Sequence, residues 1–317
     1  MKKIYCLFML LVLAGCGDKP FEPLVFGAIT WPGYEPAYVA RELGFLDEGR
    51  IHLAEFTNTT EVVRALRNGR LHVAGLTLDE ALGLRQSVPD LQIFLVADVS
   101  HGADVLMARR GIKNLGQLKG KRIGVEKTAL GAYFLSLILR AAHLSANEVR
   151  IVSLPLDEHV DAYRAGLVDA VVTFGLTRHE LSRQGAVALF DSTQVPGKIV
   201  DTLVVRAADA DKYSEQLKIL VKAWFRALHV IQNDPARAYP LMARHERVSA
   251  EEIGETLHGL VLLDLRQNLL QLSGAQAPLL NTAGGIQRVL KQAGLAAGSD
   301  DLSLLVNSRI VTEAGFE

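Results

Sequence analysis

The stretch "NTTEVVRALRNGRLHVAGL", residues 58–76, places a helical pattern directly before a strand. Asn58 and Glu61 have the spacing of a capping box at the start of the helix, and Gly69 suits its C-terminal end. The run "LHVAGL" that follows has the apolar character of a strand. A helix that leads straight into a strand is the repeating unit of α/β folds, which have parallel strands and right-handed crossovers.

The same alternation continues on both sides of this stretch. The segment "AYRAGLVDAVVTF", residues 162–174, echoes "ALRNGRLHVAGLT", residues 65–77, although the two are out of register by Thr173. The echo supports two similar lobes without proving a duplication. After residue 206 the pattern becomes mainly helical and includes an amphipathic core helix over residues 215–231. Further strands are predicted in "LVFGAIT" (24–30), "RIHLAEF" (50–56), "KRIGVE" (121–126) and "EVRIVSL" (148–154).

This organisation predicts two lobes, the first of which is discontinuous in sequence. The first lobe comprises residues 22–103 plus 203–317, and the second comprises residues 104–202. The segments "VADVSHGADVL" (96–106) and "KIVDTLVV" (198–205) would be the paired crossings between them. No low-complexity linker separates the lobes, as expected if two strands form the hinge.

The N-terminus reads as a targeting segment rather than as part of the fold. Two lysines precede the apolar run "IYCLFMLLVLAG", residues 4–15, which is too short to span a bilayer but fits a secretory signal peptide over residues 1–15. The run ends in "LAGC", which resembles the lipobox of bacterial lipoproteins. That resemblance implies lipidation at Cys16, a tether over residues 16–21, and an extracytoplasmic protein anchored in either membrane of the envelope. Cleavage would remove Cys6 and leave no disulfide.

Composition and motifs exclude several classes of function. The chain has 317 residues, 22% of them charged, and a formal net charge of −1, so nucleic acid is not an expected partner. The nine histidines form no His-Glu-x-x-His motif or close pair, and no glycine-rich phosphate loop occurs. We therefore expect no metal and no cofactor. Because no nucleophile and base stand in a recognisable set, we expect no enzyme.

Four segments carry a family resemblance. They are "WPGYEPAYVARELGFL" (31–46), "LRNGRLHVAGLTLDEAL" (66–82), "IKNLGQLKGKRIGVEKTALGAYFL" (112–135) and "YRAGLVDAVVTF" (163–174). Together they resemble the nitrate/sulfonate/taurine class of solute-binding proteins, which serve ABC importers and have relatives that bind thiamine-pyrimidine precursors. The resemblance implies an α/β, two-lobed type II periplasmic-binding-protein fold, with two parallel-rich sheets flanked by helices and a two-strand hinge. It also implies a monomer that captures a small oxyanion, sulfonate or pyrimidine-like molecule and docks on a permease.

The strand ends predict where a ligand would bind. In open parallel sheets ligands lie beyond the carboxyl ends of the strands. The loops at residues 30–35, 76–79, 126–132 and 173–176 have that position, and they would converge on one cleft if the two lobes face each other. Trp31 and Tyr34 stand in the first loop, either as an aromatic wall for a ligand or as anchors packed on the following helix.

The remaining candidates each have two interpretations. Thr128, Leu130 and Gly131 stand where a helix begins, which favours an anion, but Thr128 is equally suited to cap that helix. The chain departs here from the hydroxyl-rich pattern of the family. Thr77 is likewise a cap or a ligand contact. Asp79 and Glu35 are either contacts for a cationic ligand or first-turn acids that stabilise helices.

The loop after the strand at residues 168–174 departs further from the family. Relatives often carry Trp-(Asp/Glu)-Pro there, whereas this chain has Thr173, Phe174 and Gly175. Phe174 keeps an aromatic contact, but the acidic one is missing, so the ligand specificity of relatives does not transfer directly. Asp201, at the second crossing, is interpreted as a tie for the hinge backbone rather than a ligand contact.

Two other functions stay open beside import. A lipoprotein of the same fold would present its closed state to a membrane sensor instead of a permease. An enzyme similar to the fungal pyrimidine-precursor synthases would share the fold, but those carry a cysteine-rich motif. The mature chain would keep only Cys16, so we do not expect that chemistry.

Overall fold

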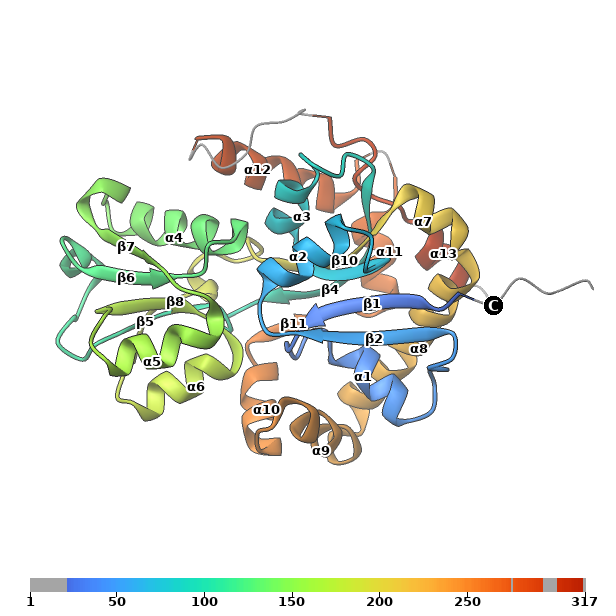
Figure 1. Cartoon of the computed structure of the whole chain (residues 1–317), viewed down its shortest axis with the longest axis horizontal. Helices are drawn as coiled ribbons and strands as arrows, with labels where there is room; N and C mark the ends of the chain where they lie inside the picture. Colours follow the sequence, from blue (N-terminus) through green and yellow to red (C-terminus); the bar gives the residue numbers. More distant parts are fainter. Residues whose placement is uncertain (1–21, 275, 293–300, 316–317) are drawn as a thin grey trace, which may run out of the picture.

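The computed structural model describes residues 22–274, 276–292 and 301–315, and its elements form two α/β bodies that lie side by side (Figure 1). The predicted signal peptide, the tether and the lipidation site Cys16 lie outside the described residues. In the part of the chain that is described, no helix has the length and apolar character needed to cross a membrane.

The larger body is built on a six-stranded mixed sheet with the order β11-β4-β10-β3-β1-β2. Strands β1, β2 and β3 are parallel, whereas β10 is antiparallel to both of its neighbours, β3 and β4. The six strands are β1 (Leu24–Ile29), β2 (Ile51–Phe56), β3 (Val73–Thr77), β4 (Leu91–Ser100), β10 (Val200–Arg206) and β11 (Leu260–Leu262).

The smaller body is built on a five-stranded mixed sheet with the order β7-β6-β8-β5-β9. Strand β6 is parallel to β7 and β8, and β5 is antiparallel to β8 and β9. Its strands are β5 (Val105–Ala108), β6 (Arg122–Val125), β7 (Arg150–Ser153), β8 (Ala170–Thr173) and β9 (Val187–Asp191).

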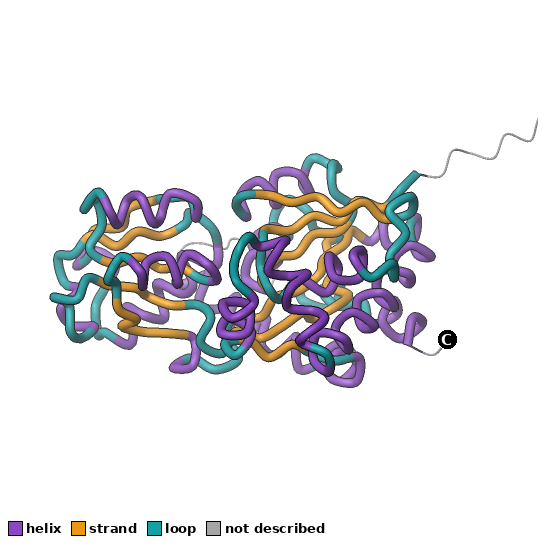
Figure 2. Tube along the Cα trace, turned by 90° about the horizontal axis from the view of Figure 1, so that it is seen from below, coloured by secondary structure: helices purple, strands orange, loops and turns teal. Residues whose placement is uncertain are grey.

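Helices cover both faces of each sheet, as the two perpendicular views show (Figures 1 and 2). In the small body, α4 lies on one face and α5 and α6 on the other. The helices are α1 (Glu35–Glu42), α2 (Thr59–Arg67), α3 (Leu78–Leu84), α4 (Ala129–Ala141), α5 (His159–Arg164), α6 (Gly175–Arg183), α7 (Ala207–Lys212), α8 (Ser214–Asn233), α9 (Pro235–Glu246), α10 (Ala250–Leu257), α11 (Leu265–Leu272), α12 (Pro278–Gln292) and α13 (Arg309–Gly315).

The chain passes between the two sheets twice. It leaves the large sheet at the end of β4 and enters the small sheet at β5, then returns from β9 to β10. The prediction of an α/β fold with two sheets and a two-strand connection is confirmed. Both sheets are mixed rather than parallel throughout. In each sheet, one strand next to a crossing is antiparallel to both of its neighbours.

The core of the large body forms around α8, as its amphipathic pattern predicts. The buried face of this helix includes Leu217, Leu220, Trp224 and Ile231, which recur three, four and seven residues apart. Trp224 is fully buried. Each such side chain stabilises the fold by about 1.5–3 kcal/mol relative to an exposed one.

Local signals in the sequence explain the helix ends near the junction of the two bodies. The Asn58 side chain accepts a hydrogen bond from the Glu61 backbone N–H at 3.1 Å, so it caps α2. Gly69, after the helix, has a φ of 71°, which glycine adopts without strain. The capping spacing at residues 58–61 therefore predicts the start of the helix correctly.

We predict that Asn58→Ala lowers the free energy of unfolding by about 1 kcal/mol, because it leaves a helix N–H without its cap. Urea denaturation of the purified protein measures the change. Asn68→Ala is the matched control, since that exposed asparagine at the other end of α2 contributes only backbone groups to the cap and should change stability by less than about 0.5 kcal/mol. Equal losses in the two variants would contradict the capping role.

Candidate functional site

A cavity lies at the junction of the two bodies. Its volume is about 20 Å³, room for one or two waters, and it is partly open to solvent. Both bodies and both crossings contribute to it. The lining residues are Ile29, Trp31, Tyr34, Thr59, Gly75, Thr77 and Glu80 from the large body, Asp104 and Asp201 at the crossings, and Leu130 and Phe174 from the small body.

Trp31 reaches the cavity from the loop after β1 and is fixed by a buried carboxyl group. Its indole Nε1–H donates to Asp98 Oδ2 on β4 at 3.0 Å. Its ring meets Phe174 of the small body edge to face, with the centroids 5.6 Å apart. Gly33 permits this geometry, since a Cβ atom there would lie 1.7 Å from Asp98 Oδ2. The indole is thus both an anchor of the loop and a wall of the cavity.

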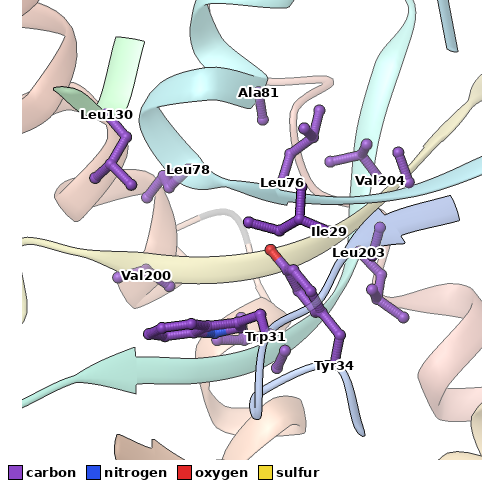
Figure 3. Close-up of a cluster of buried hydrophobic side chains, with 14 of the residues drawn as sticks. Ile29, Trp31, Tyr34, Leu76, Leu78, Ala81, Leu130, Val200, Leu203 and Val204 are labelled. Atoms are coloured by element: carbon purple, nitrogen blue, oxygen red, sulfur yellow. The ribbon is translucent and has the colours of Figure 1, made fainter. Parts of the chain in front are cut away.

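Tyr34 rises from the same loop toward β10 (Figure 3). Its hydroxyl donates to Asp201 Oδ1 at 2.5 Å. The ring lies over Gly75 of β3, where an added Cβ would approach Tyr34 Cζ to 2.8 Å. Burial, followed by the charge of Asp201, raises the pKa of Tyr34 well above its usual value, so the phenol stays protonated. Asp201 therefore binds a side chain of the aromatic loop, whereas the sequence suggested a tie to the hinge backbone.

Carboxyl groups dominate the polar part of the cavity. Glu80 Oε2 accepts from the Thr77 backbone N–H at 3.1 Å, while Glu80 Oε1 has no partner among the described residues. Burial raises the pKa of Glu80 and Asp201 well above the usual range and that of Asp104 to about 7. Asp98, behind Trp31, has its pKa raised to about 8 for the same reason.

Only some of the residues at the start of α4 line the cavity. Leu130 lines it, but Thr128 lines an adjoining groove, and Gly131 is on neither surface. The Thr128 hydroxyl accepts from the Gly131 backbone N–H at 3.1 Å, so Thr128 caps the helix. A Cβ at Gly131 would lie 2.2 Å from the Glu126 carbonyl oxygen, which accounts for glycine there.

Of the other candidate residues from the sequence, some line the cavity and others do not. Thr77 and Phe174 line the cavity. Thr173 does not, because its hydroxyl lies 3.2 Å from Nδ1 of the buried His159. Glu35 pairs with His245 Nδ1 at 2.5 Å, and Asp79 is fully buried away from the lining.

Sequence reasoning missed Glu80 and Asp104 as cavity residues. Glu80 had one signal, since it follows Thr77 at capping distance, and that role is real: its side chain accepts from the Thr77 N–H. A cap that also lines the cavity cannot be recognised from spacing alone. Asp104 lies within the first crossing, where the sequence gives no signal for a side chain that faces the cavity.

Polar contacts join the two bodies at the rim. Arg183 of α6 pairs with Glu252 of α10, and His179 Nε2 lies 3.0 Å from Thr256 Oγ1. Arg178 donates to the Gly102 carbonyl oxygen in the first crossing. The bodies are thus held together around the cavity. Within the described ranges no group of three or more histidine, cysteine or acidic residues is arranged to hold a metal ion.

Comparison with known proteins places the chain in a family. Residues 17–243, well over half of the chain, match the NMT1-like family. The taurine-binding periplasmic protein of Escherichia coli strain K12 is 27% identical over 291 residues, which cover 87% of this chain and 89% of that protein.

Two solved structures with different functions have the same fold as this chain. The aliphatic sulphonate-binding protein SsuA of Escherichia coli superimposes with a TM-score of 0.73 at 17% identity, over 90% of this chain and 92% of its own. The desulfurization enzyme DSZB superimposes with a TM-score of 0.68 at 16% identity, over 92% and 98%. The fold is therefore shared by binding proteins and by an enzyme.

We predict that the protein loses stability as the pH rises from about 6.5 to 8. Unfolded carboxyl groups are ionised throughout this range, whereas burial keeps Asp98, with its pKa of about 8, largely protonated in the folded state. The folded state therefore binds more protons, and its stability falls with rising pH. The buried His159, whose pKa is lowered from 6.5 to about 4, acts in the opposite direction, and this opposition fades as the pH rises above 6.5.

Urea denaturation at several pH values tests this expectation. Asp98→Asn should make the dependence on pH less steep, while Asp104, whose pKa burial raises to about 7, maintains the remainder. Asp169→Asn is the control, because its partner Arg122 lowers the pKa of Asp169 to about 2, below the range, so this variant should lose stability equally at each pH. A stability that rises from pH 6.5 to 8 would contradict the assignment.

Proposed function

The chain belongs to the NMT1-like family, and from that premise we propose that it is an extracytoplasmic solute-binding protein that delivers a small molecule to an ABC importer. The observation that carries the proposal is the cavity to which both bodies and both crossings contribute side chains. The taurine-binding periplasmic protein, which is similar over most of its length, supports the same role.

The proposed mechanism is closure of two lobes on the ligand. The first lobe would comprise residues 22–103 plus 203–317 and the second residues 104–202, with the crossings as the hinge. Ligand would bind first to the loop that carries Trp31 and Tyr34, and closure would bring Leu130 and Phe174 over it. A ligand shifts this equilibrium only through contacts that it gains in the closed state, which here come from the second lobe.

We further propose that the protein is a monomer held at the membrane through lipid on Cys16. The support is the sequence "LAGC" at residues 13–16 after an apolar run. More than one acyl chain would make such an anchor durable. The closed lobes would then meet the permease at the membrane surface.

Thermal unfolding of the purified protein against a panel of sulfonates, nitrate, bicarbonate, pyrimidines and amines tests ligand capture. A true ligand at about a hundred times its dissociation constant adds about 2.7 kcal/mol of stability. Trp31→Ala should abolish the shift, because it removes a wall of the cavity. Tyr239→Ala, a half-buried aromatic outside the lining, should keep it. A shift that survives in Trp31→Ala would exclude this cavity as the site.

The rim contacts provide a separate test of closure. Arg183→Ala removes the pair with Glu252 that joins α6 to α10, so it should weaken ligand affinity by up to about fivefold, since exposed ion pairs contribute at most about 1 kcal/mol. Arg164→Ala is the control, because its pair with Asp161 lies within one helix. Isothermal titration measures both variants with the ligand found above. Equal affinities in the two variants would count against closure through this contact.

A further inference from the structure

The ionisable side chains around the cavity are all acids. Glu80, Asp104 and Asp201 line it, and Asp98 stands directly behind Trp31. All four are buried, between 0% and 5% exposed. None of the described residues on the lining is a lysine, arginine or histidine. The carboxyl groups thus have no positive partner from the protein at the cavity surface.

Polar atoms without a partner among the described residues remain at the cavity, namely the Thr77 hydroxyl and one oxygen of Glu80. Tyr34 satisfies one oxygen of Asp201, and the Thr77 N–H satisfies one oxygen of Glu80. The second oxygen of Glu80 has no partner in the described structure, although the residue is only 5% exposed. A buried acceptor without a donor costs about 1–3 kcal/mol. A molecule that donates hydrogen bonds at this position would remove that cost.

The same geometry disfavours an anionic group inside the cavity. A nitrate or sulfonate would bring negative charge and further acceptors beside carboxyl groups, and a buried charge needs a partner of opposite sign. The N–H of Gly131 at the start of α4 is already bound by Thr128.

Positive charge is found instead in the adjoining groove. Arg64, Arg67 and Lys127 line it and are exposed, and it shares Thr59 and Glu80 with the cavity. An anionic group on another part of the ligand could therefore face the groove while its cationic end lies in the cavity.

We propose that the cavity holds the protonated nitrogen of a small organic amine, with Glu80, Asp104 and Asp201 as its counter-charges, and not a nitrate or sulfonate group. A primary ammonium supplies three donors and one positive charge, which the cavity lacks. This inference rests on the proposed function, because it assigns the chemical class of the ligand of that same site. It separates the ligand from nitrate and from sulfonates that lack an amine, whereas taurine, in the name of one similar protein, carries an amine.

Matched pairs of probes test the inference. In each pair one molecule carries an amine and the other does not. The pairs are taurine and ethanesulfonate, 1,4-diaminobutane and 1,4-butanediol, and benzylamine and benzyl alcohol, with nitrate as a further probe. Isothermal titration at pH 7.5 gives the affinities, and a change in tryptophan fluorescence that is absent in Trp31→Ala, which keeps Trp224, reports binding in the cavity. In at least one pair the amine should bind at least tenfold more tightly than its partner, and nitrate should not displace it.

Variants identify the counter-charges. Glu80→Gln keeps an acceptor for the Thr77 N–H but loses the charge, and it should weaken binding of the amine at least tenfold. Asp104→Asn is a second variant in case the first does not fold. Glu158→Gln, which neutralises an exposed acid on the small body, should bind as the unaltered protein does. Weaker binding of the amine in either cavity variant supports the inference. If both variants fold and both bind the amine with unchanged affinity, the inference is overturned.

The outcomes also separate this inference from the proposed function. If an amine-free probe or nitrate binds in the cavity as tightly as the amines, or if every pair differs by less than tenfold, the ligand class is wrong and capture of a small molecule stands. Retained binding of an anion in Glu80→Gln would then show that the charge of Glu80 is not needed for binding. If no probe binds, both the inference and the proposed function fail.

Discussion

Two buried carboxyl groups, Asp98 on β4 and Asp201 on β10, hold the aromatic loop to the strands that lead into the small body. Asp98 binds the Trp31 indole and Asp201 binds the Tyr34 hydroxyl. Because β4 and β10 are next to the two crossings, the loop and the connection between the bodies form one hydrogen-bonded unit. A change in the angle between the bodies would therefore act directly on the walls of the cavity.

Burial of these carboxyl groups has an electrostatic cost, which is concentrated at the cavity. Burial raises the pKa of Asp104 to about 7 and that of Asp98 to about 8, and it raises those of Glu80 and Asp201 well above their usual range. Concentrations of shifted carboxyl groups are typical of functional sites, where a ligand supplies the missing partner. The rest of the large body has an extensive apolar core around α8.

The sequence was sufficient for the architecture and for part of the site. Alternation of helices and strands predicts the two sheets, and the rule that ligands lie beyond strand ends correctly brings Trp31, Thr77 and Phe174 to one cavity. Thr173 also ends a strand, but side chains alternate along β8, so its hydroxyl turns to His159 while Phe174 faces the cavity. Local sequence patterns could not predict the hydrogen-bond partners of Trp31 and Tyr34, since these partners lie 67 and 167 residues away in sequence.

Small-angle X-ray scattering of the purified protein, with and without a saturating ligand, tests hinge closure most directly. If the two bodies shut on a molecule held at their junction, the radius of gyration should fall on binding. A radius that stays constant while the ligand is bound would contradict the account.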